Sequence, residues 1–353
     1  MKKIEMIETR QLLEILVLVC ALVGAALVLL RRHLKRKYAV PARVWVSPAE
    51  PQFRDFSQPG APATRFRVLG GVAGTCEHED DDDKEAAALP PEDTAGEVQL
   101  SVVIPAYNEE ARLPRTLEEY GAHLAARADH DTDFTYEILV VDDGSRTAGT
   151  AEAAEAYART HSRPGRDVRV LRLARNRGKG GAVRRGVLCA RGAAVLFADA
   201  DGATAAPEIS HLYDALRAAE AEVAKGPEGK PAEVVAIGTR PERQDEGRRV
   251  LSAGFRWLVR ALCVRGVRDT QCGFKMFTRA AAGALFPRLH VERWAFDVEL
   301  LYLAQRRGVA LVQRDVAWHD VAGSTLSPVH AALQMARDLV RIRLLYALRV
   351  WTP

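Results

Sequence analysis

The chain has 353 residues, of which 48% are hydrophobic and 27% charged, with 50 Lys and Arg against 46 Asp and Glu, a formal net charge of +4. This composition supports a folded core and excludes a wholly disordered chain. The absence of any repeat of about 20–50 residues excludes a solenoid or propeller. A charge of +4, with aromatic residues at 7%, does not predict a nucleic-acid partner. Five scattered cysteines without a CxxC pair predict reduced thiols, not disulfides or a zinc site.

The first predicted element is a membrane-spanning helix over residues 12–30, an apolar stretch in which only Glu14 is charged. At about 1.5 Å per residue this helix covers roughly 28 Å, close to a hydrocarbon core of about 30 Å. A cleaved signal peptide or a buried core helix is the alternative, but five cations follow at once within Arg31–Lys37. By the positive-inside rule, residues 1–11 are luminal and the chain beyond the helix is cytosolic.

Residues 31–96 are expected to form a linker that is basic at first and then irregular, because prolines recur along it. It contains an acidic block at 77–85, EHEDDDDKE, with seven acids and one lysine. Such blocks are usually solvated loops, so metal capture is only the alternative interpretation. A catalytic domain is expected over 97–327.

From residue 97 onward, short runs rich in Val and Ile alternate with segments of helical periodicity. This alternation predicts an α/β fold with a mostly parallel sheet and helices on both faces, in which ligands bind at the carboxyl ends of the strands. The predicted strands cover 100–104, 137–141, 168–173, 193–198 and 234–237. The predicted helices cover 109–128, 150–161, 180–190 and 207–223.

Two acidic pairs stand at predicted strand ends. Asp142 and Asp143 precede a turn, where the ordinary role of an aspartate is to cap the next helix, although Ser145 suffices for that. A carboxylate there can equally read a nucleobase N–H and a ribose hydroxyl, and the residues leave both interpretations open. Asp199 and Asp201, in ADADG, are two apart on an extended segment and can face one cation. Carboxylate oxygens suit Mg²⁺ or Mn²⁺ completed by substrate phosphates, and a solvated loop is the alternative.

Between these pairs lies RNRGKGGAVRRG, within a stretch from Arg175 to Arg191 that has six cations and no acid. It matches neither the P-loop nor GxGxxG. Its glycines are expected to let backbone N–H groups approach a phosphate at a helix start, with Lys179 as a donor-site contact. A base-reading carboxylate, a metal pair and a basic loop together suit a nucleotide diphosphate sugar, whose leaving group the metal neutralises.

The motifs IPAYNEE, VVDDGS and DADG, in this order and spacing, resemble the family 2 glycosyltransferases of the GT-A fold, over residues 99–351. Within that family, RNRGKGGAVRRG, ADADGAT, DTQCGFKMF and HVERWAFDVELLYLAQ are most similar to the eukaryotic dolichyl-phosphate β-glucosyltransferases. The resemblance implies a Rossmann-like GT-A domain and inverting transfer of glucose from UDP-glucose to dolichyl phosphate. It also implies a place at the cytosolic face of the endoplasmic reticulum membrane, in lipid-linked oligosaccharide assembly for N-glycosylation.

The resemblance further implies roles for individual residues. Asp199 and Asp201 hold the metal and the pyrophosphate, Ala200 lines the sugar, Arg240 is the donor-side arginine and Gln271 borders the sugar. The uridine pocket comprises Pro105, Tyr107, Glu109, Val141 and Asp143, with Asp142 nearby.

The acceptor phosphate is expected to lie near His319 and Thr325, by the same resemblance. Relatives commonly carry lysine at the Thr325 position, so Arg268, Lys275 or Arg337 is the substitute contact. A phosphate with a second pKa of about 6 is already anionic near pH 7 and needs positioning more than a general base.

Asp297 and Glu299 lie on a predicted helix in RWAFDVELL. Asp297 is a candidate catalytic residue beside Asp199, Asp201 and Arg240. The alternative is that both acids are helix-surface or ion-pair carboxylates. Residues 328–353 are expected to form a basic amphipathic helix, either packed on the core or lying in the membrane interface, and residues 254–266 have the same mixed character.

The sequence thus predicts a membrane-anchored glycosyltransferase with UDP-glucose, dolichyl phosphate and the bilayer as partners and Mg²⁺ or Mn²⁺ as cofactor. A polyprenyl-phosphate transferase that uses GDP-mannose or another sugar is the nearest alternative. An inactive membrane-tethered nucleotide-sugar-binding protein is the alternative from another class, disfavoured by the intact acidic pair and basic loop.

Overall fold

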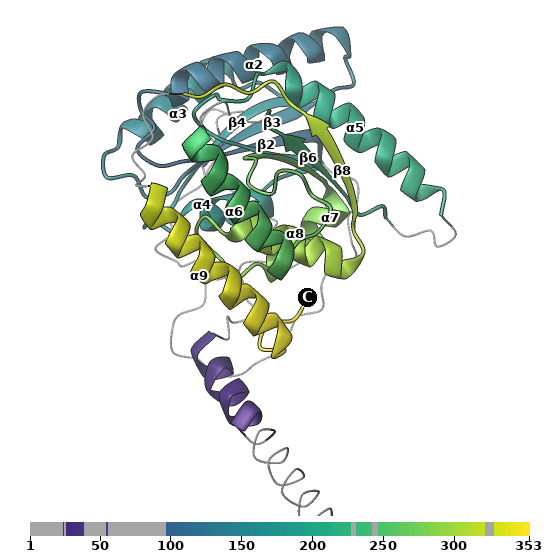
Figure 1. Ribbon diagram of the computed structural model, residues 1–353. Helices are drawn as coiled ribbons and strands as arrows, with labels where there is room; N and C mark the ends of the chain where they lie inside the picture. The colour runs from purple at the N-terminus through teal and green to yellow at the C-terminus, as the bar shows by residue number, and fades with distance from the viewer. Residues whose placement is uncertain are drawn as a thin grey trace, which may run out of the picture.

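The computed structural model describes residues 24, 26–38, 54–55, 97–226, 231–241, 246–321 and 328–353, without the side chains of 54–55, 246–252 and 328–333. Within these ranges the chain forms a sheet with helices on both faces (Figure 1). The strands are β1 (Arg54–Asp55), β2 (Val98–Ala106), β3 (Tyr136–Asp142), β4 (Arg166–Arg172), β5 (Gly192–Ala198), β6 (Val234–Thr239), β7 (Phe274–Thr278) and β8 (Ala310–Asp315). The helices are α2 (Leu113–His130), α3 (Gly149–His161), α4 (Lys179–Leu188), α5 (Pro207–Ala224), α6 (Glu246–Leu262), α7 (Arg279–Leu285), the 3-10 turn η1 (Phe286–Arg288), α8 (Phe296–Arg307) and α9 (Pro328–Ala347), besides a helix over 26–38.

The strand order is β1-β4-β3-β2-β5-β7-β6-β8. Strands β4, β3, β2 and β5 are mutually parallel, with Val102 paired to both Ile138 and Leu196, and β6 is parallel to β8. β7 runs antiparallel to both of its neighbours, β5 and β6. The predicted α/β fold with a mostly parallel sheet is therefore confirmed, and each of the five predicted strands overlaps an observed one.

Three strands were not predicted. β7, FKMFT, is only five residues long, and its direction depends on partners distant in sequence. β8 is a half-exposed edge strand that lacks a continuous apolar run. β1 pairs antiparallel with β4, although it falls within the segment expected to be irregular.

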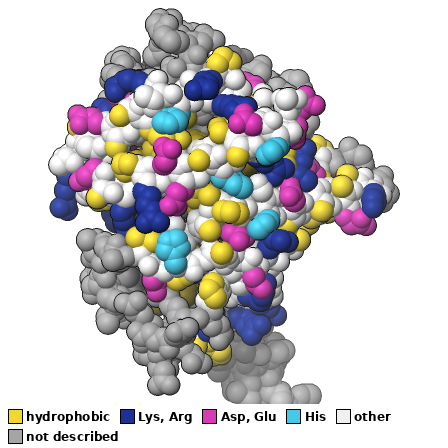
Figure 2. Space-filling view, turned by 90° about the horizontal axis from the view of Figure 1, so that it is seen from above, with side chains coloured by type: hydrophobic (Ala, Val, Ile, Leu, Met, Phe, Trp, Pro, Cys, Tyr) yellow, Lys and Arg dark blue, Asp and Glu magenta, His cyan; other side chains and the backbone are white. Residues whose placement is uncertain are grey.

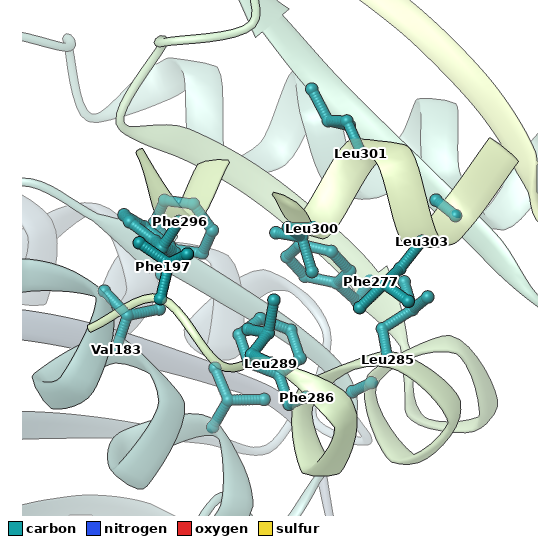
Figure 3. Packing of buried hydrophobic residues seen from close by; sticks show 14 of the residues in the cluster. Val183, Phe197, Phe277, Leu285, Phe286, Leu289, Phe296, Leu300, Leu301 and Leu303 are labelled. Atoms are coloured by element: carbon teal, nitrogen blue, oxygen red, sulfur yellow. The ribbon is translucent and has the colours of Figure 1, made fainter. Parts of the chain in front are cut away.

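Side chains alternate along the central strands and so build a core on each face of the sheet. Val103 and Val141 join one cluster with residues of α4, α7 and α8, whereas Val102 and Val140 join the other with residues of α2, α3 and α5. Figure 3 shows the first cluster, in which Phe197 of β5 lies beside Phe296 of α8. Both faces of the central strands are covered, so these strands are almost wholly buried, and polar groups within them, such as Ser101 and Glu137, are hydrogen-bonded to each other.

α6 and α9 lie side by side and contribute Val259 and Leu339 to the first cluster, and the helix over 26–38 lies near the end of α9 (Figure 1). The indole N–H of Trp351 donates to the carbonyl of Tyr38 at 3.1 Å, which fixes this helix to the C-terminal residues. Over the described face seen in Figure 2, acidic, basic and histidine side chains are interspersed with apolar ones.

The predicted membrane span over 12–30 lies largely outside the described residues, which include only 24 and 26–30 of it. None of the helices in the described ranges is long and apolar enough to cross a membrane. The acidic block at 77–85 also lies outside the described part of the chain.

Candidate active site

Four chain segments meet at one edge of the sheet. The register pairs Ala106 with Asp142, so parallel strands β2 and β3 end together, and β5 ends beside them. Because β7 is antiparallel to β5, its first residue, Phe274, pairs with the last residue of β5, Ala198. The loop that precedes β7, containing Gln271, therefore reaches the same edge as the acidic pairs of β3 and β5.

The two aspartates at the end of β3 have separate roles in the structure. Asp142 Oδ1 accepts hydrogen bonds from the backbone N–H and the hydroxyl of Ser145, at 3.1 and 2.5 Å, and closes the turn locally. The carboxylate of Asp143 accepts from the backbone N–H groups of Arg177 and Gly178, at 2.7 and 2.8 Å. Burial raises the pKa of Asp143 to about 6, while these two donors act in the opposite direction. Asp143 thus holds the glycine-rich loop against the sheet.

The loop after β2 presents the remaining uridine-pocket candidates. Tyr107 is 36% exposed. Asn108 has φ of 54°, and its backbone N–H donates to Ser145 Oγ at 2.9 Å, which joins this loop to the one after β3. Glu109 accepts two hydrogen bonds from Arg112, at 2.5 and 2.7 Å. Burial raises the pKa of Glu109 although Arg112 opposes the shift. Of the other uridine-pocket candidates, Val141 is buried and Pro105 is half-buried, and Ala200, predicted to line the sugar, is buried.

Asp199 and Asp201 are partly exposed at the end of β5. The loop they belong to is held by Thr116 of α2, whose hydroxyl donates to the carbonyl of Ala200 at 2.8 Å. Asp201 Oδ1 accepts from the backbone N–H of Ala203 at 3.1 Å. Among the described residues, no group of three or more His, Cys, Asp or Glu side chains is arranged so that it could hold a metal ion. This donor set of two carboxylates fits Mg²⁺ or Mn²⁺ that takes its other ligands from water and substrate phosphates.

Three cations lie around the acidic pair, each bound to a different carboxylate. Lys179, the first residue of α4, places Nζ 2.6 Å from Asp199 Oδ1. Arg240 makes two hydrogen bonds to Asp269, at 2.7 and 2.9 Å. Burial alone would lower the pKa of Arg240, but the contact with Asp269 outweighs it and raises that pKa.

The third cation, Lys275, is fully buried. Its Nζ donates to Asp297 and to the carbonyl of Cys272, both at 2.6 Å. Burial raises the pKa of Asp297, while Lys275 and Lys179 act to lower it. The structure therefore places Lys275 and Asp297, two predicted site residues, in an interior ion pair behind the acidic motif.

The glycine-rich loop is packed tightly against the segment before α8. Gly178 has φ of +83°, and a Cβ there would lie 2.8 Å from the carbonyl oxygen of Glu292. A Cβ on Gly180 would lie 2.5 Å from Cβ of Phe296. The glycines are thus required for packing. The sequence predicted that backbone N–H groups of this loop approach a phosphate, but those of Arg177 and Gly178 donate to Asp143.

Several cations of the basic stretch also have partners within the fold. Arg177 donates to Glu292 at 3.3 Å, and Arg184 donates to the carbonyls of Phe286 and Pro287. Arg191 is bound to the buried Glu137 at 2.9 Å. These contacts stabilise the fold, and Lys179 is the cation of this stretch that reaches the acidic motif.

The predicted acceptor contacts are placed apart from one another. His319 is exposed, and its backbone N–H donates to the carbonyl of Ala203, so it adjoins the acidic motif. Arg268 is bound to Asp315 at the end of β8, at 2.8 Å. Arg337 is exposed on α9, and Thr325 lies outside the described residues.

Sequence reasoning assigned no role to Asp269, Gly273 or Trp294. Asp269 binds Arg240, Gly273 packs directly on the carboxylate of Asp199, and the Trp294 ring lies 6.0 Å from Lys179 Nζ. Asp269 and Gly273 both belong to the motif DTQCGFKMF, so their position in that motif was the sequence signal for a place in the site. Nothing local to Trp294 indicates its position.

Comparison with known proteins gives two kinds of match. Residues 101–285 match the model of the family described as Glycosyl transferase family 2. Dolichyl-phosphate beta-glucosyltransferase of Dictyostelium discoideum is 43% identical over 262 residues, 72% of this chain and 76% of that protein. The proteins of the same name from Mus musculus and Homo sapiens are 47% and 46% identical, over 72% of this chain and 77% of each.

Among solved structures, this chain is similar to glucosyl-3-phosphoglycerate synthase from Mycobacterium tuberculosis in complex with Mn²⁺, UDP-glucose and phosphoglyceric acid. The TM-score is 0.47 and the identity 20%, over 70% of this chain and 79% of that one.

Proposed function

The chain belongs to glycosyl transferase family 2, and on this premise we propose that it transfers glucose from UDP-glucose to dolichyl phosphate with inversion at the anomeric carbon. The observation that carries this proposal is the 43–47% identity to dolichyl-phosphate beta-glucosyltransferases over 72% of the chain. The product, dolichyl β-D-glucosyl phosphate, serves as a glucosyl donor in lipid-linked oligosaccharide assembly for N-glycosylation.

In this proposal the uridine binds between the loops that follow β2 and β3. Tyr107 and Pro105 flank the base, and Asp143 accepts a hydrogen bond from it. Although Asp143 already accepts two backbone N–H groups, a carboxylate has about four lone-pair positions and can accept a further donor. Val141 and Glu109 complete the pocket, and Asp142 supports it by closing the turn.

The diphosphate lies over Asp199 and Asp201, which would hold Mg²⁺ or Mn²⁺. When bound, such a metal stabilises the charge that develops on the departing diphosphate. Lys179 and Arg240 supply positive charge on the protein side, and Ala200 and Gln271 border the glucose. The Nε2 atom of Gln271 is buried and has no hydrogen-bond partner among the described residues, which leaves it available to a sugar hydroxyl.

The reaction is a single displacement. An oxygen of dolichyl phosphate attacks the anomeric carbon from the face opposite the diphosphate, and the electron pair of the breaking C–O bond leaves with UDP. The acceptor oxygen is already anionic near pH 7, so no side chain has to remove a proton.

We assign acceptor binding first to His319, because its backbone N–H is hydrogen-bonded to the carbonyl of Ala203, next to the acidic motif. Arg268, Arg337 and Thr325 stay as predicted contacts of the acceptor. Asp297 and Lys275 form an interior pair, and we assign them a positioning role behind Asp199 instead of direct contact with substrate.

We further propose that a helix over 12–30 anchors the chain in the endoplasmic reticulum membrane, with the catalytic domain in the cytosol. Leu27–Leu30 are exposed on the described helix and are followed by the basic flank. The exposed apolar side chains of Trp257 on α6 and of Val340 and Leu344 on α9 support a second contact with the bilayer.

The test is an assay of the purified full-length chain with dolichyl phosphate, Mg²⁺ or Mn²⁺, and UDP-glucose, UDP-galactose or GDP-mannose in separate reactions. We expect lipid-linked glucose from UDP-glucose, with β configuration by NMR. Product from GDP-mannose but not from UDP-glucose would reject the donor assignment in favour of a mannosyltransferase.

A further inference from the structure

The inference concerns the contact between Lys179 and Asp199, which joins the glycine-rich loop to the acidic motif. Nζ of Lys179 lies 2.6 Å from Oδ1 of Asp199, with side chains that are 15% and 39% exposed. Burial alone would lower the pKa of Lys179, but the charges of Asp199 and Asp297 outweigh it and raise that pKa. The ammonium thus occupies an oxygen that the proposed function assigns to a divalent cation.

The other two cations beside Asp199 are bound elsewhere. Arg240 is held by two hydrogen bonds to Asp269, and Lys275 is enclosed between Asp297 and a backbone carbonyl. If either cation left its partner, it would leave unpaired a carboxylate that is mostly buried (Asp269) or fully buried (Asp297), which is costly. Of these three cations, Lys179 is the one that contacts Asp199 directly.

Lys179 can leave Asp199 at a lower cost than the other two cations can leave their partners, because the side chain of Asp199 is 39% exposed and stays hydrated. Lys179 is the first residue of α4, and its ammonium is a point charge on a flexible four-carbon chain. The ring of Trp294 lies 6.0 Å from Nζ and offers a second favourable position for the cation. A bound diphosphate would offer a third.

We propose that Lys179 competes with the divalent cation for Asp199, so that metal binds weakly to the enzyme alone and tightly only together with the nucleotide diphosphate. The cation and the ammonium cannot both occupy Oδ1 of Asp199. The arriving diphosphate draws the ammonium onto its own oxygens and frees the carboxylate. This coupling rests on the proposed function, because it assumes that Asp199 binds metal.

The coupling is measured with the full-length protein by titrating Mn²⁺ and following free Mn²⁺ by electron paramagnetic resonance, with and without saturating UDP. In Lys179→Met we expect Mn²⁺ alone to bind about tenfold more tightly than to the natural protein, a typical size for coupling between two ligands. The gain in Mn²⁺ affinity caused by UDP should shrink by a similar factor. Lys225→Met, which removes an exposed lysine paired to Glu222 at the end of α5, should bind Mn²⁺ like the natural protein.

Direct competition between Lys179 and Mn²⁺ for Asp199 can be distinguished from long-range repulsion between the two charges, because the two effects depend differently on salt. Free charges are screened within about 4–5 Å at 0.5 M salt, whereas a direct, partly buried contact is screened less. The ratio of Mn²⁺ affinities between Lys179→Met and the natural protein should therefore persist at 0.5 M NaCl. Lys179→Gln serves as a second variant if the methionine variant does not fold.

The outcomes separate this inference from the proposed function. Equal Mn²⁺ affinity in the natural protein and Lys179→Met, or a difference abolished by salt, overturns the competition while leaving the metal site in place. Absence of Mn²⁺ binding to either protein, even with UDP, rejects the metal assignment of the proposed function, and the competition with it.

Discussion

The indole ring of Trp351 lies flat against the imidazole ring of His290, with centroids 4.2 Å apart and planes 10° apart. Nδ1 of His290 and the hydroxyl of Tyr346 both contact the fully buried carboxylate of Glu299, at 2.8 and 2.9 Å. Trp351 also donates to the carbonyl of Tyr38. Tyr38 is therefore linked through Trp351 and His290 to Glu299 of α8, the helix that also carries Asp297 of the ion pair behind the acidic motif.

Trp351→Ala should destabilise the protein, because it empties a site where the indole is 2% exposed and removes the bond to Tyr38. Truncation of a buried Trp costs about 3–5 kcal/mol. The matched control is Trp257→Ala on α6, where the side chain is 69% exposed and the cost should stay within about 0.5 kcal/mol. Denaturant unfolding in detergent measures both, and equal midpoints for the two variants would contradict the anchoring role of Trp351.

Asp201→Asn should abolish metal-dependent transfer while the protein still folds. The amide oxygen can still accept the 3.1 Å hydrogen bond from the backbone N–H of Ala203, so the loop keeps its shape, but the charge that a metal requires is lost. In the proposed reaction a bound metal would supply several kcal/mol to the transition state, so turnover should fall by at least about 100-fold. Glucosyl transfer and thermal unfolding are measured side by side, and retained turnover would remove Asp201 from the metal site.

Binding of UDP-glucose should weaken as the pH falls through about 6. The pKa of Asp143 is raised to about 6 by burial, so the carboxylate becomes protonated below that pH and loses an acceptor for the base. The affinity for UDP-glucose, measured by calorimetry without acceptor lipid, should fall with decreasing pH, and the fall should approach about tenfold per pH unit below pH 6. Asp143→Asn should bind more weakly at pH 7 and show a flat profile between pH 7 and 5. A natural protein with an equally flat profile would exclude Asp143 from the pocket.

Gly273→Ala should impair metal binding and catalysis, because a Cβ at this position would overlap the carboxylate of Asp199. A displacement of about 1 Å at a reacting centre can reduce the rate about 100-fold. Gly283→Ala in α7 is the matched control, since nothing lies within 4 Å of its Cβ position. There the added helix propensity should stabilise the protein by up to about 1 kcal/mol. Full activity in Gly273→Ala would show that Asp199 can move aside without loss.

The double variant Trp257→Ser and Leu344→Ser should raise the KM for dolichyl phosphate in liposomes and leave the KM for UDP-glucose unchanged. Both side chains are exposed on α6 and α9, so their loss does not create a cavity. Val223→Ser, an exposed apolar residue near the end of α5, is the control and should alter neither constant. An unchanged KM for the lipid in the double variant would argue against a bilayer contact at α6 and α9.

Sequence periodicity predicted the elements whose pattern is local. Strands buried on both faces, such as β3 with ILVV, appear as apolar runs, and the acids that follow them mark the active edge of the sheet. β7 could not be placed, because its antiparallel direction depends on pairing with β5, about 75 residues earlier in the chain. The ion pairs of the site could not be predicted from the sequence either. Lys179 with Asp199 and Lys275 with Asp297 are separated by about 20 residues, and only the fold selects these partners.

The basic stretch around Arg177 and Arg191 was interpreted as a phosphate signal because its partners were unknown. The acids that neutralise it lie elsewhere in the chain: Glu137 on β3, Asp167 on β4 and Glu292 in the segment before α8. A run of cations with no acid nearby in sequence can therefore form ion pairs within the fold as readily as it can bind a ligand.

The antiparallel direction of β7 has a consequence for protein engineering. Its neighbour β6 ends at Thr239 and β7 begins at Phe274, so the chain between them leaves and returns at one place on the sheet. Arg240 and Asp269 join the two ends of this excursion by a pair of hydrogen bonds. The segment between them carries α6, which packs on α9 and places Val259 in the first hydrophobic cluster. An exchange of this segment between relatives would therefore keep Arg240 and Asp269 at its boundary, together with the residues of α6 that pack on the cluster.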